Sequence, residues 1–255
     1  MIPIKNKSQI RIMKEGGKRL SWVLNQVLKE VKPGIALWQL DKLAETLIKK
    51  QGGRPSFKMV PKYHWTTCIN INEGVVHGIP GEYQLKENDL VSIDVGMFYQ
   101  GFHVDMARTV EVRSGKWEVG KFLAVGERAL RKAIKAAKAG NRVGHISQAM
   151  EKELREAGFS PIETLTGHGV GQKLHEEPQI PCLLVEQIEK TPPLKNGMVL
   201  AIETIYAQGK PDLVISDDDW TIKTADGKLS GLFEETVVIN GKKPLVLTSS
   251  QELLD

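Results

Sequence analysis

The sequence has little cysteine, no long apolar run and no strong excess of one charge. Cys68 and Cys182 are its only cysteines, too few for a disulfide framework, which favours a reducing compartment. No apolar stretch is long enough to cross a bilayer, and residues 1–8 lack the apolar core of a secretory signal. The net charge of +4 is spread along the chain and gives no specific nucleic-acid signature. These absences predict a cytoplasmic protein that has no membrane partner.

The apolar residues that are present predict four helices. They make up 41% of the 255 residues, enough for one sizeable core. They recur at intervals of three and four in four segments that end at glycines. The predicted helices cover about 8–31, 37–52, 122–139 and 146–158, and Ser8 is the expected N-cap of the first.

The plan of two helices followed by strands occurs twice along the chain. Leu85–Asp94 reads against Leu194–Glu203, which makes Asp94 and Glu203 equivalent. We therefore predict one α+β domain over 1–255, with internal pseudo-repeats at about 8–112 and 118–240. Its strands are expected to form a mixed, curved sheet backed by helices, with pseudo-twofold symmetry.

The first group of strands carries two aspartates. A strand pattern of period two begins at Val91, and Gln100-Gly101 is a turn signal before a second extended segment. If a hairpin closes around this turn, Asp94 and Asp105 lie opposite each other or one place apart. Two ionised carboxylates so close, when partly buried, need a cation between them, or one must hold a proton. Taken alone, the pair also fits a solvated hairpin face.

Two strands of the second copy also carry carboxylates. Leu200–Ile205 is apolar except for Glu203, and the segment offers no Lys or Arg partner. Leu232–Ile239 begins with two adjacent acids, which point to opposite faces, so only one can face a site. Glu234 is the expected site residue, by symmetry with Asp105 at the start of its own strand.

Three histidines lie in settings that suit a site. His168 is in a glycine-flanked loop, Thr166–Gly171, whose flexible backbone would let an imidazole approach a metal closely. His175 lies seven residues further on, and His77 is its counterpart in the first copy, each three residues before a proline. The other histidines are interpreted as ordinary packed or surface residues: His64, His103 and His145.

Four acids and one histidine form a set of mostly hard oxygen ligands. Such a set suits two divalent ions bridged by carboxylates, with Mn, Fe, Co or Zn as candidates, rather than a Cys-rich structural site. Two ions about 3.5–4 Å apart lower the pKa of a bridging water and clamp a tetrahedral intermediate. The set therefore predicts hydrolysis, and aminopeptidases use this chemistry.

Several segments match one known family in order and spacing: Cys68–Pro80, Ile93–Asp105, Gly167–Gly171, His175–Pro178, Ile202–Glu203, Trp220–Ser230 and Glu234. Together they resemble the methionine aminopeptidases of the short, bacterial-type class, over essentially the whole chain. The resemblance implies the pita-bread fold, which prolidase and aminopeptidase P share. It also implies a metallo-exopeptidase that removes the initiator methionine from nascent proteins and prefers a small second residue. Transient work at the ribosome, as a monomer, is expected.

The resemblance implies five metal ligands. Asp94 would hold one ion through both oxygens, while Asp105 and Glu234 would bridge the two ions. His168 and Glu203 would complete the shell of the other ion. A water bridging the ions is the implied nucleophile.

The resemblance also implies catalytic and pocket residues. Glu203 would take a proton from the water and pass it to the leaving amine. His77 would contact the scissile amide nitrogen, and His175 would stabilise the carbonyl oxygen as charge develops. The methionine side chain would enter an apolar pocket built from Tyr63, Cys68 and Trp220. For the last two, ordinary core packing is the alternative.

Three positions depart from the family pattern. Leu174 stands where the short class often has an aromatic residue, Val60 at a position commonly Tyr, and Leu232 at one commonly polar. They concern the shape of the pocket, and hence strictness for methionine, rather than the ligands.

Two other functions remain open at this point. One is a Pro-directed peptidase of the same fold, although such relatives usually carry a large extra N-terminal domain. The other is a pita-bread protein without metals that only binds peptides, ribosomes or nucleic acid. That reading would be expected to come with at least one substituted ligand, and all five positions hold suitable chemistry.

Overall fold

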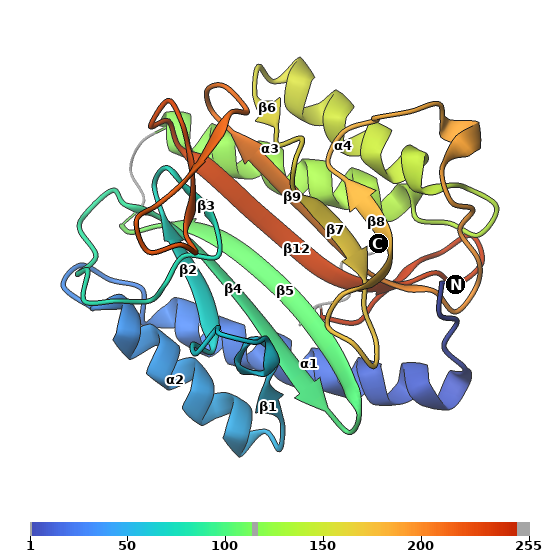
Figure 1. Cartoon of the computed structure of the whole chain (residues 1–255), viewed down its shortest axis with the longest axis horizontal. Helices are drawn as coiled ribbons and strands as arrows, with labels where there is room; N and C mark the ends of the chain where they lie inside the picture. Colours follow the sequence, from blue (N-terminus) through green and yellow to red (C-terminus); the bar gives the residue numbers. More distant parts are fainter. Residues whose placement is uncertain (1, 114–116, 249–255) are drawn as a thin grey trace.

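Pairs of helices alternate with groups of strands along the chain (Figure 1). The computed structural model describes residues 2–113 and 117–248. The helices are α1 (Lys7–Lys29), α2 (Leu37–Lys50), α3 (Trp117–Ala136) and α4 (Val143–Glu156), with 3-10 turns η1 (Phe57–Met59) and η2 (Ile188–Lys190). The strands of the first half are β1 (Arg54–Pro55), β2 (Thr67–Ile71), β3 (Gly74–Val76), β4 (Leu90–Tyr99) and β5 (Phe102–Glu111). Those of the second half are β6 (Ser160–Pro161), β7 (Thr166–Gly169), β8 (Glu176–Pro181), β9 (Val199–Ala207), β10 (Leu213–Ile215), β11 (Ile222–Thr224), β12 (Ser230–Val238) and β13 (Leu245–Val246).

The first helix, α1, has its N-cap at Asn6 and not at the predicted Ser8. The N-cap is Asn6, whose side chain accepts a hydrogen bond from Gln9 N, while the Gln9 side chain accepts from Asn6 N. This reciprocal capping box satisfies two backbone donors at once, so it outcompetes a lone serine cap. The Ser8 hydroxyl instead donates to Asn6 Oδ1 at 2.6 Å, and the prediction of Ser8 as N-cap is wrong.

The strands form one large sheet and one small one. The large sheet runs β1-β4-β5-β12-β9-β7-β8, with β2, β6 and β13 paired at its margins, and the small sheet is β10-β11-β3. In the chain as described, each strand pair within these sheets is antiparallel, which differs from the predicted mixed sheet. Two neighbouring parallel strands need a long crossover connection that returns the chain to the end of the sheet where the first strand began. Here the helix pair α3–α4 instead leads from β5 to strands of the other half.

The hairpin of β4 and β5 has a different register from the predicted one. Tyr99 pairs with Phe102, so the loop is two residues long. Both loop residues have positive φ, 46° at Gln100 and 92° at Gly101, as a tight primed turn requires. Asp94 therefore faces Ala107 and Asp105 faces Gly96, so the two acids are diagonal neighbours, neither opposite nor one place apart.

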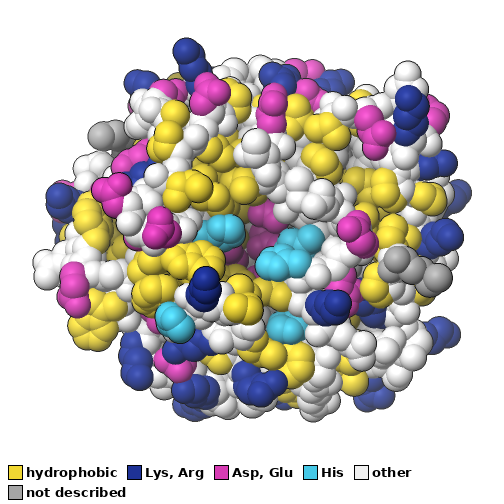
Figure 2. All heavy atoms as spheres, in the orientation of Figure 1, with side chains coloured by type: hydrophobic (Ala, Val, Ile, Leu, Met, Phe, Trp, Pro, Cys, Tyr) yellow, Lys and Arg dark blue, Asp and Glu magenta, His cyan; other side chains and the backbone are white. Residues whose placement is uncertain are grey.

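The helices cover one face of the large sheet, and the acids lie on the other face. The pairs α1–α2 and α3–α4 lie behind the two halves of the sheet in the view of Figure 1. From the same side, Figure 2 shows a hollow at the centre, with acidic side chains at its floor and histidines beside them.

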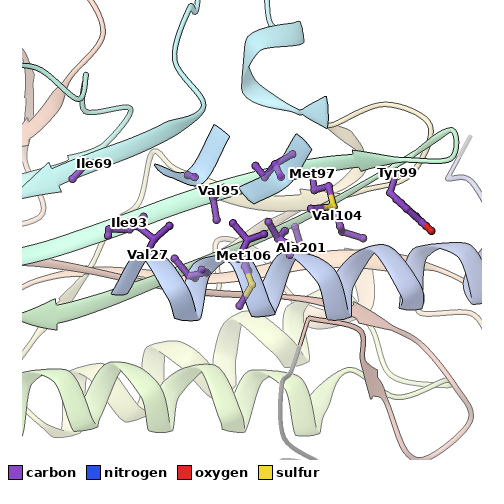
Figure 3. Close-up of a cluster of buried hydrophobic side chains, with 14 of the residues drawn as sticks. Val27, Ile69, Ile93, Val95, Met97, Tyr99, Val104, Met106 and Ala201 are labelled. Carbon is purple, nitrogen blue, oxygen red and sulfur yellow. The ribbon is translucent and has the colours of Figure 1, made fainter. Parts of the chain in front are cut away.

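The hydrophobic core lies between the sheet and the helices. Figure 3 shows Val27 of α1 beside Ile93 and Met106, which share a buried cluster. Behind the other half, Phe122 of α3 packs against Tyr206 of β9, whose hydroxyl donates to the Phe122 carbonyl at 2.8 Å. Because side chains alternate along a strand, this burial fixes the neighbouring residues on the opposite, open face.

The order of two helices followed by strands recurs in the second half, as Figure 1 shows. One domain over 1–255 with an internal pseudo-repeat stays a prediction. Within residues 2–113 and 117–248, no helix has the length and apolar character needed to traverse a bilayer.

Candidate metal centre and active site

Three acids lie in a single row across four strands of the large sheet. Asp94 of β4 faces Ala107 of β5, Ala107 faces Glu234 of β12, and Glu234 faces Glu203 of β9. Cys68 of β2 extends the row beyond Asp94. The methyl side chain of Ala107 stands between carboxylates on either side, so the row is open at its centre. Antiparallel pairing of strands from both halves thus gathers acids that are far apart in sequence.

A second row, two residues along the strands, brings Asp105 and His168 to the same face. Asp105 faces Gly96, and His168 of β7 faces Ala201 of β9. Asp105, His168 and Glu234 each place a potential ligand atom within 4.8 Å of those of the other two. These three side chains form a candidate metal site in the described chain, with Asp94 and Glu203 beside it.

All ten side chains that the sequence singled out line one cavity. Its volume is about 860 Å³, and its floor and walls include Tyr63, Cys68, His77, Asp94, Asp105, His168, His175, Glu203, Trp220 and Glu234. Asp105 and Glu234 are 3% exposed, so they form the floor, while the His77 and His175 side chains are exposed at the rim. The structure therefore places the predicted residues together. It does not test the role of each.

The carboxyl groups cannot all be ionised in this setting without a counter-charge. Burial raises the pKa of Asp94 to about 7. Burial, and then the nearby charges of Asp94 and Glu203, raise the pKa of Asp105 well above its ordinary value. Burial and then Asp94 do the same to the pKa of Glu203, and burial and then Asp105 to that of Glu234. The buried oxygen Oδ1 of Asp94 has no hydrogen-bond partner among the described residues.

The imidazole of His168 has the tautomer and the neutral charge that a metal ligand needs. Its Nδ1 lies 2.9 Å from the carbonyl oxygen of Gly169, and a carbonyl can only accept, so Nδ1 carries the proton. The lone pair is then on Nε2, the arrangement found in histidines that bind metals. Burial, and then the neighbouring His175, lower the pKa of His168 to about 4, so the ring is neutral at physiological pH. Thr166–Gly169 is a short strand, β7, rather than the predicted loop.

His77 and His175 come from different halves of the chain and both line the cavity that holds the candidate metal site. His175 packs edge-on against His168, with ring centroids 4.5 Å apart. His77 has φ of 59°, a left-handed conformation that is rare for a residue with a Cβ. The turn is fixed by Gly78, whose N–H donates to Asn70 Oδ1 at 2.9 Å and whose Cβ, if present, would lie 2.2 Å from a carbonyl oxygen. Strain of this kind is typical of functional positions.

An aromatic cluster forms one wall of the cavity. Tyr63 contacts Trp220 edge-to-face with centroids 5.0 Å apart, and Cys68 lies in the same apolar cluster. Of the positions that depart from the family pattern, Leu174 and Val60 line the cavity here. Leu232 instead packs in a separate buried cluster and does not line it.

The remaining candidates from the sequence have structural partners. Glu235, the neighbour of Glu234, points to the helix face, is 1% exposed and pairs with Arg108. His103 is buried against Ser56 and Phe98, and the ring of His145 accepts from the backbone N–H that precedes α4. His64 is exposed.

Sequence reasoning missed two features that support the site. A Cβ on Gly96 would lie 2.8 Å from Ser56 Cβ and 3.2 Å from Asp105 Oδ1, so this glycine makes room for the carboxylate. The signal was a glycine at the second position after Asp94 in a strand. The other feature is a buried ion pair, 2.6 Å long, between Lys5 and Glu176, next to His175. No local signal predicts it, because the two residues are far apart in the sequence.

Comparisons with known proteins identify the family of this chain. A family model, metallopeptidase family M24, matches residues 11–240. The methionine aminopeptidase of Clostridium perfringens is 41% identical over 248 residues, covering 97% of this chain and 99% of that protein. A solved methionine aminopeptidase from Thermotoga maritima superposes with a TM-score of 0.94 at 38% identity, covering 98% and 100% of the two chains. Prolidase from Pyrococcus furiosus has a TM-score of 0.79 at 24% identity over 98% of this chain and 66% of its own, a likeness of fold alone.

The chain belongs to metallopeptidase family M24. Within that family it is similar to methionine aminopeptidases along nearly its whole length. The predicted pita-bread α+β fold and the predicted family are confirmed.

The residues present fit the metal ions that the family name implies. Carboxylate oxygens and one imidazole suit divalent ions such as Mn, Fe, Co or Zn. Asp94 Oδ1, which has no hydrogen-bond partner in the described chain, and the neutral ring of His168 are both available to bind a cation. Among the described residues, no Lys or Arg forms an ion pair with the four acids of the site, which are Asp94, Asp105, Glu203 and Glu234.

Proposed function

We propose that this chain removes the initiator methionine from nascent proteins. In this proposal two divalent ions are held by Asp94, Asp105, His168, Glu203 and Glu234. One observation carries it: these side chains, from five strands, converge on the floor of one cavity without a counter-charge from the described protein. Four carboxylates balance the charge of two divalent ions.

When bound, the ions would lower the pKa of water and polarise the scissile carbonyl. Glu203 is half-buried on the cavity floor, where its carboxylate can take a proton from the attacking water and give it to the leaving amine. Although His175 lies at the exposed rim, partial desolvation by the cavity wall lowers its pKa, which favours the neutral ring, and its N–H can donate to the developing oxyanion. His77, which lines the same cavity, can contact the scissile amide nitrogen.

The cluster beside the acids supports methionine as the first residue. Tyr63, Cys68 and Trp220 offer aromatic and sulfur surface, and a thioether makes favourable contacts with aromatic rings. The proposal includes a preference for a small second residue, which the family resemblance implies.

The proposed setting is the cytoplasm, where newly made chains present their N-terminal residue. The enzyme would act there as a monomer and associate only transiently with the ribosome. Support comes from the family resemblance and from the mildly basic charge of +4, which suits brief contact with an RNA-rich surface.

A peptide assay tests this proposal. Protein stripped with chelator receives Mn, Co, Fe or Zn in turn, and Met-Ala-Ser and Ala-Pro-Ala are offered side by side. We expect metal-dependent release of Met from the first peptide alone. A matched variant, Asp105→Asn, keeps the shape of the side chain but removes its charge and should lose both metal and turnover.

Cleavage of Ala-Pro-Ala instead would assign the chain to Pro-directed peptidases of the same fold. Metal binding without turnover of either peptide would overturn the proposal in favour of a binding protein. Full activity of Asp105→Asn would show that the ligand assignment is wrong.

A further inference from the structure

The boundary between β5 and β12, here called the central seam, joins the strands that carry Asp105 and Glu234. β12 pairs with β9 along its whole length. Against β5, in the described chain, its backbone register is limited to Glu234 with Ala107 and Glu235 with Met106. Side chains hold the two strands together on either side of these pairs.

At Asp105, the side chain of Thr236 takes the place of the backbone hydrogen bonds of the ladder. Its hydroxyl accepts a hydrogen bond from Asp105 N at 2.9 Å and donates one to Asp105 O at 2.8 Å. One side-chain oxygen therefore satisfies both backbone groups of a ligand residue. The Thr236 hydroxyl therefore takes the place of backbone partners at Asp105, where the backbone pairing of β5 and β12 has ended.

Thr236 is itself held firmly in place. It is 0% exposed, its N–H donates to Thr248 Oγ1 at 3.0 Å, and its carbonyl accepts from Leu247 N at 2.8 Å. Its other neighbour in the sheet is Ala201, the residue that also faces His168. The hydroxyl thus lies at a fixed point between β12, the strand of Glu234, and β5, the strand of Asp105. Asp105 and Glu234 are two of the three residues whose potential ligand atoms lie within 4.8 Å of one another.

The other end of the central seam offers a built-in comparison. There Thr109 Oγ1 accepts from Leu232 N at 2.8 Å and donates to Leu232 O at 2.7 Å. Thr109 is also buried, at 3% exposed. The bonds to the facing backbone are the same, with one further contact at 2.8 Å between Thr109 Oγ1 and Ser92 Oγ, but the backbone that Thr109 holds belongs to no proposed metal ligand.

We propose that Thr236 is a positioning residue for the metal centre. Its hydroxyl sets the separation between the strand of Asp105 and the strand of Glu234, and so sets the affinity for divalent ions. The inference rests on the proposed assignment of Asp105 and Glu234 as metal ligands. Thr236 touches neither metal nor substrate in this account and acts through the backbone of Asp105.

Three variants of the full chain test the inference: Thr236→Val, Thr236→Ser and Thr109→Val. Valine keeps the shape and removes the hydroxyl, whereas serine keeps the hydroxyl. Each stripped protein is titrated with Co²⁺ or Mn²⁺ by calorimetry, and its thermal unfolding without metal is recorded. Loss of a group that supports a ligand typically costs 10- to 100-fold in affinity. We therefore expect Thr236→Val to bind metal at least about tenfold more weakly, and Thr236→Ser within about threefold of the parent.

The Thr109→Val variant distinguishes positioning of a metal ligand from a general contribution to the stability of the sheet. It should lower the unfolding temperature about as much as Thr236→Val but keep the parent's metal affinity. Equal losses of affinity in both valine variants, or none in Thr236→Val, would overturn the inference. If Asp105→Asn and Glu234→Gln also bind metal as the parent does, the ligand assignment itself fails. If those two lose metal while Thr236→Val keeps it, only the role of Thr236 fails.

Discussion

Glu203 on β9 and Glu234 on β12 are direct cross-strand partners, and neither carboxylate forms an ion pair with a Lys or Arg in the described chain. Two like charges placed directly opposite each other destabilise a sheet. Burial raises the pKa of both groups well above the ordinary value, so without a cation the site favours their protonated forms. The pair is therefore best understood as one part of a site that is completed by metal. The predictions below start from this relationship.

Metal affinity should fall as the pH is lowered below about 7. Protons and metal ions compete for the same oxygens, and the pKa of Asp94 is raised to about 7 by burial. The pKa of His168 is lowered to about 4, so its ring stays unprotonated across this range and does not limit binding. Titration calorimetry in buffers of different ionisation enthalpy should show more protons released per metal at pH 6 than at pH 8. Constant affinity and no proton release between these values would contradict it.

Glu203→Gln should lower turnover far more than it lowers substrate binding. The amide keeps the shape but cannot carry the proton from water to the leaving amine, a role worth about 10²- to 10⁴-fold in rate. The assay compares kcat and KM for Met-Ala-Ser at saturating metal, with bound metal measured separately. Glu186→Gln, an exposed acid outside the cavity, is the matched control and should behave as the parent. Full turnover by Glu203→Gln would rule out the proton-transfer role.

Trp220→Ala should weaken selection for methionine. The ring packs edge-to-face on Tyr63 at 5.0 Å in the proposed pocket. A contact between the methionine thioether and this ring would be worth about 0.3–1.5 kcal/mol, which corresponds to a loss of about 2- to 12-fold in kcat/KM for Met-Ala-Ser. Trp117→Ala removes a tryptophan that is 74% exposed and should leave kcat/KM unchanged. Equal kinetics for both variants would place Trp220 outside the substrate pocket.

Lys5→Met should destabilise the fold strongly. The side chains of Lys5 and Glu176 are only 5% and 7% exposed, and removing one partner of a buried ion pair costs roughly 3–5 kcal/mol. Denaturant unfolding measures the loss. The control is Lys32→Met, whose pair with Glu30 is exposed and contributes about 0–1 kcal/mol.

The double variant Lys5→Met with Glu176→Gln sharpens this test. It removes both charges and should recover much of the stability, because no buried charge is left unpaired. A double variant no more stable than Lys5→Met alone would indicate that packing of the Lys5 side chain, and not its charge, holds this corner.

The sequence alone predicted which side chains line the cavity. Asp94, Glu203 and His168 stand out because a carboxylate in an apolar strand, or a histidine between glycines, needs a reason to be there. Periodicity likewise predicted the four helices, and it indicated that only one of Glu234 and Glu235 could face a site. Symmetry with Asp105 gave the choice of Glu234, and in the structure Glu235 instead pairs with Arg108. These features are local, so neighbouring residues encode them.

What only the tertiary structure decided depends on contacts between distant segments. The turn at Gln100-Gly101 set a register in which Asp94 and Asp105 are diagonal neighbours, because a two-residue loop with positive φ at both positions fixes the pairing of the whole hairpin. The central seam, with Thr236 on Asp105, brings together strands more than a hundred residues apart, and no local pattern marks that threonine. Side-chain period and chemistry are properties of the sequence, whereas register and strand separation arise only when distant segments pack against each other.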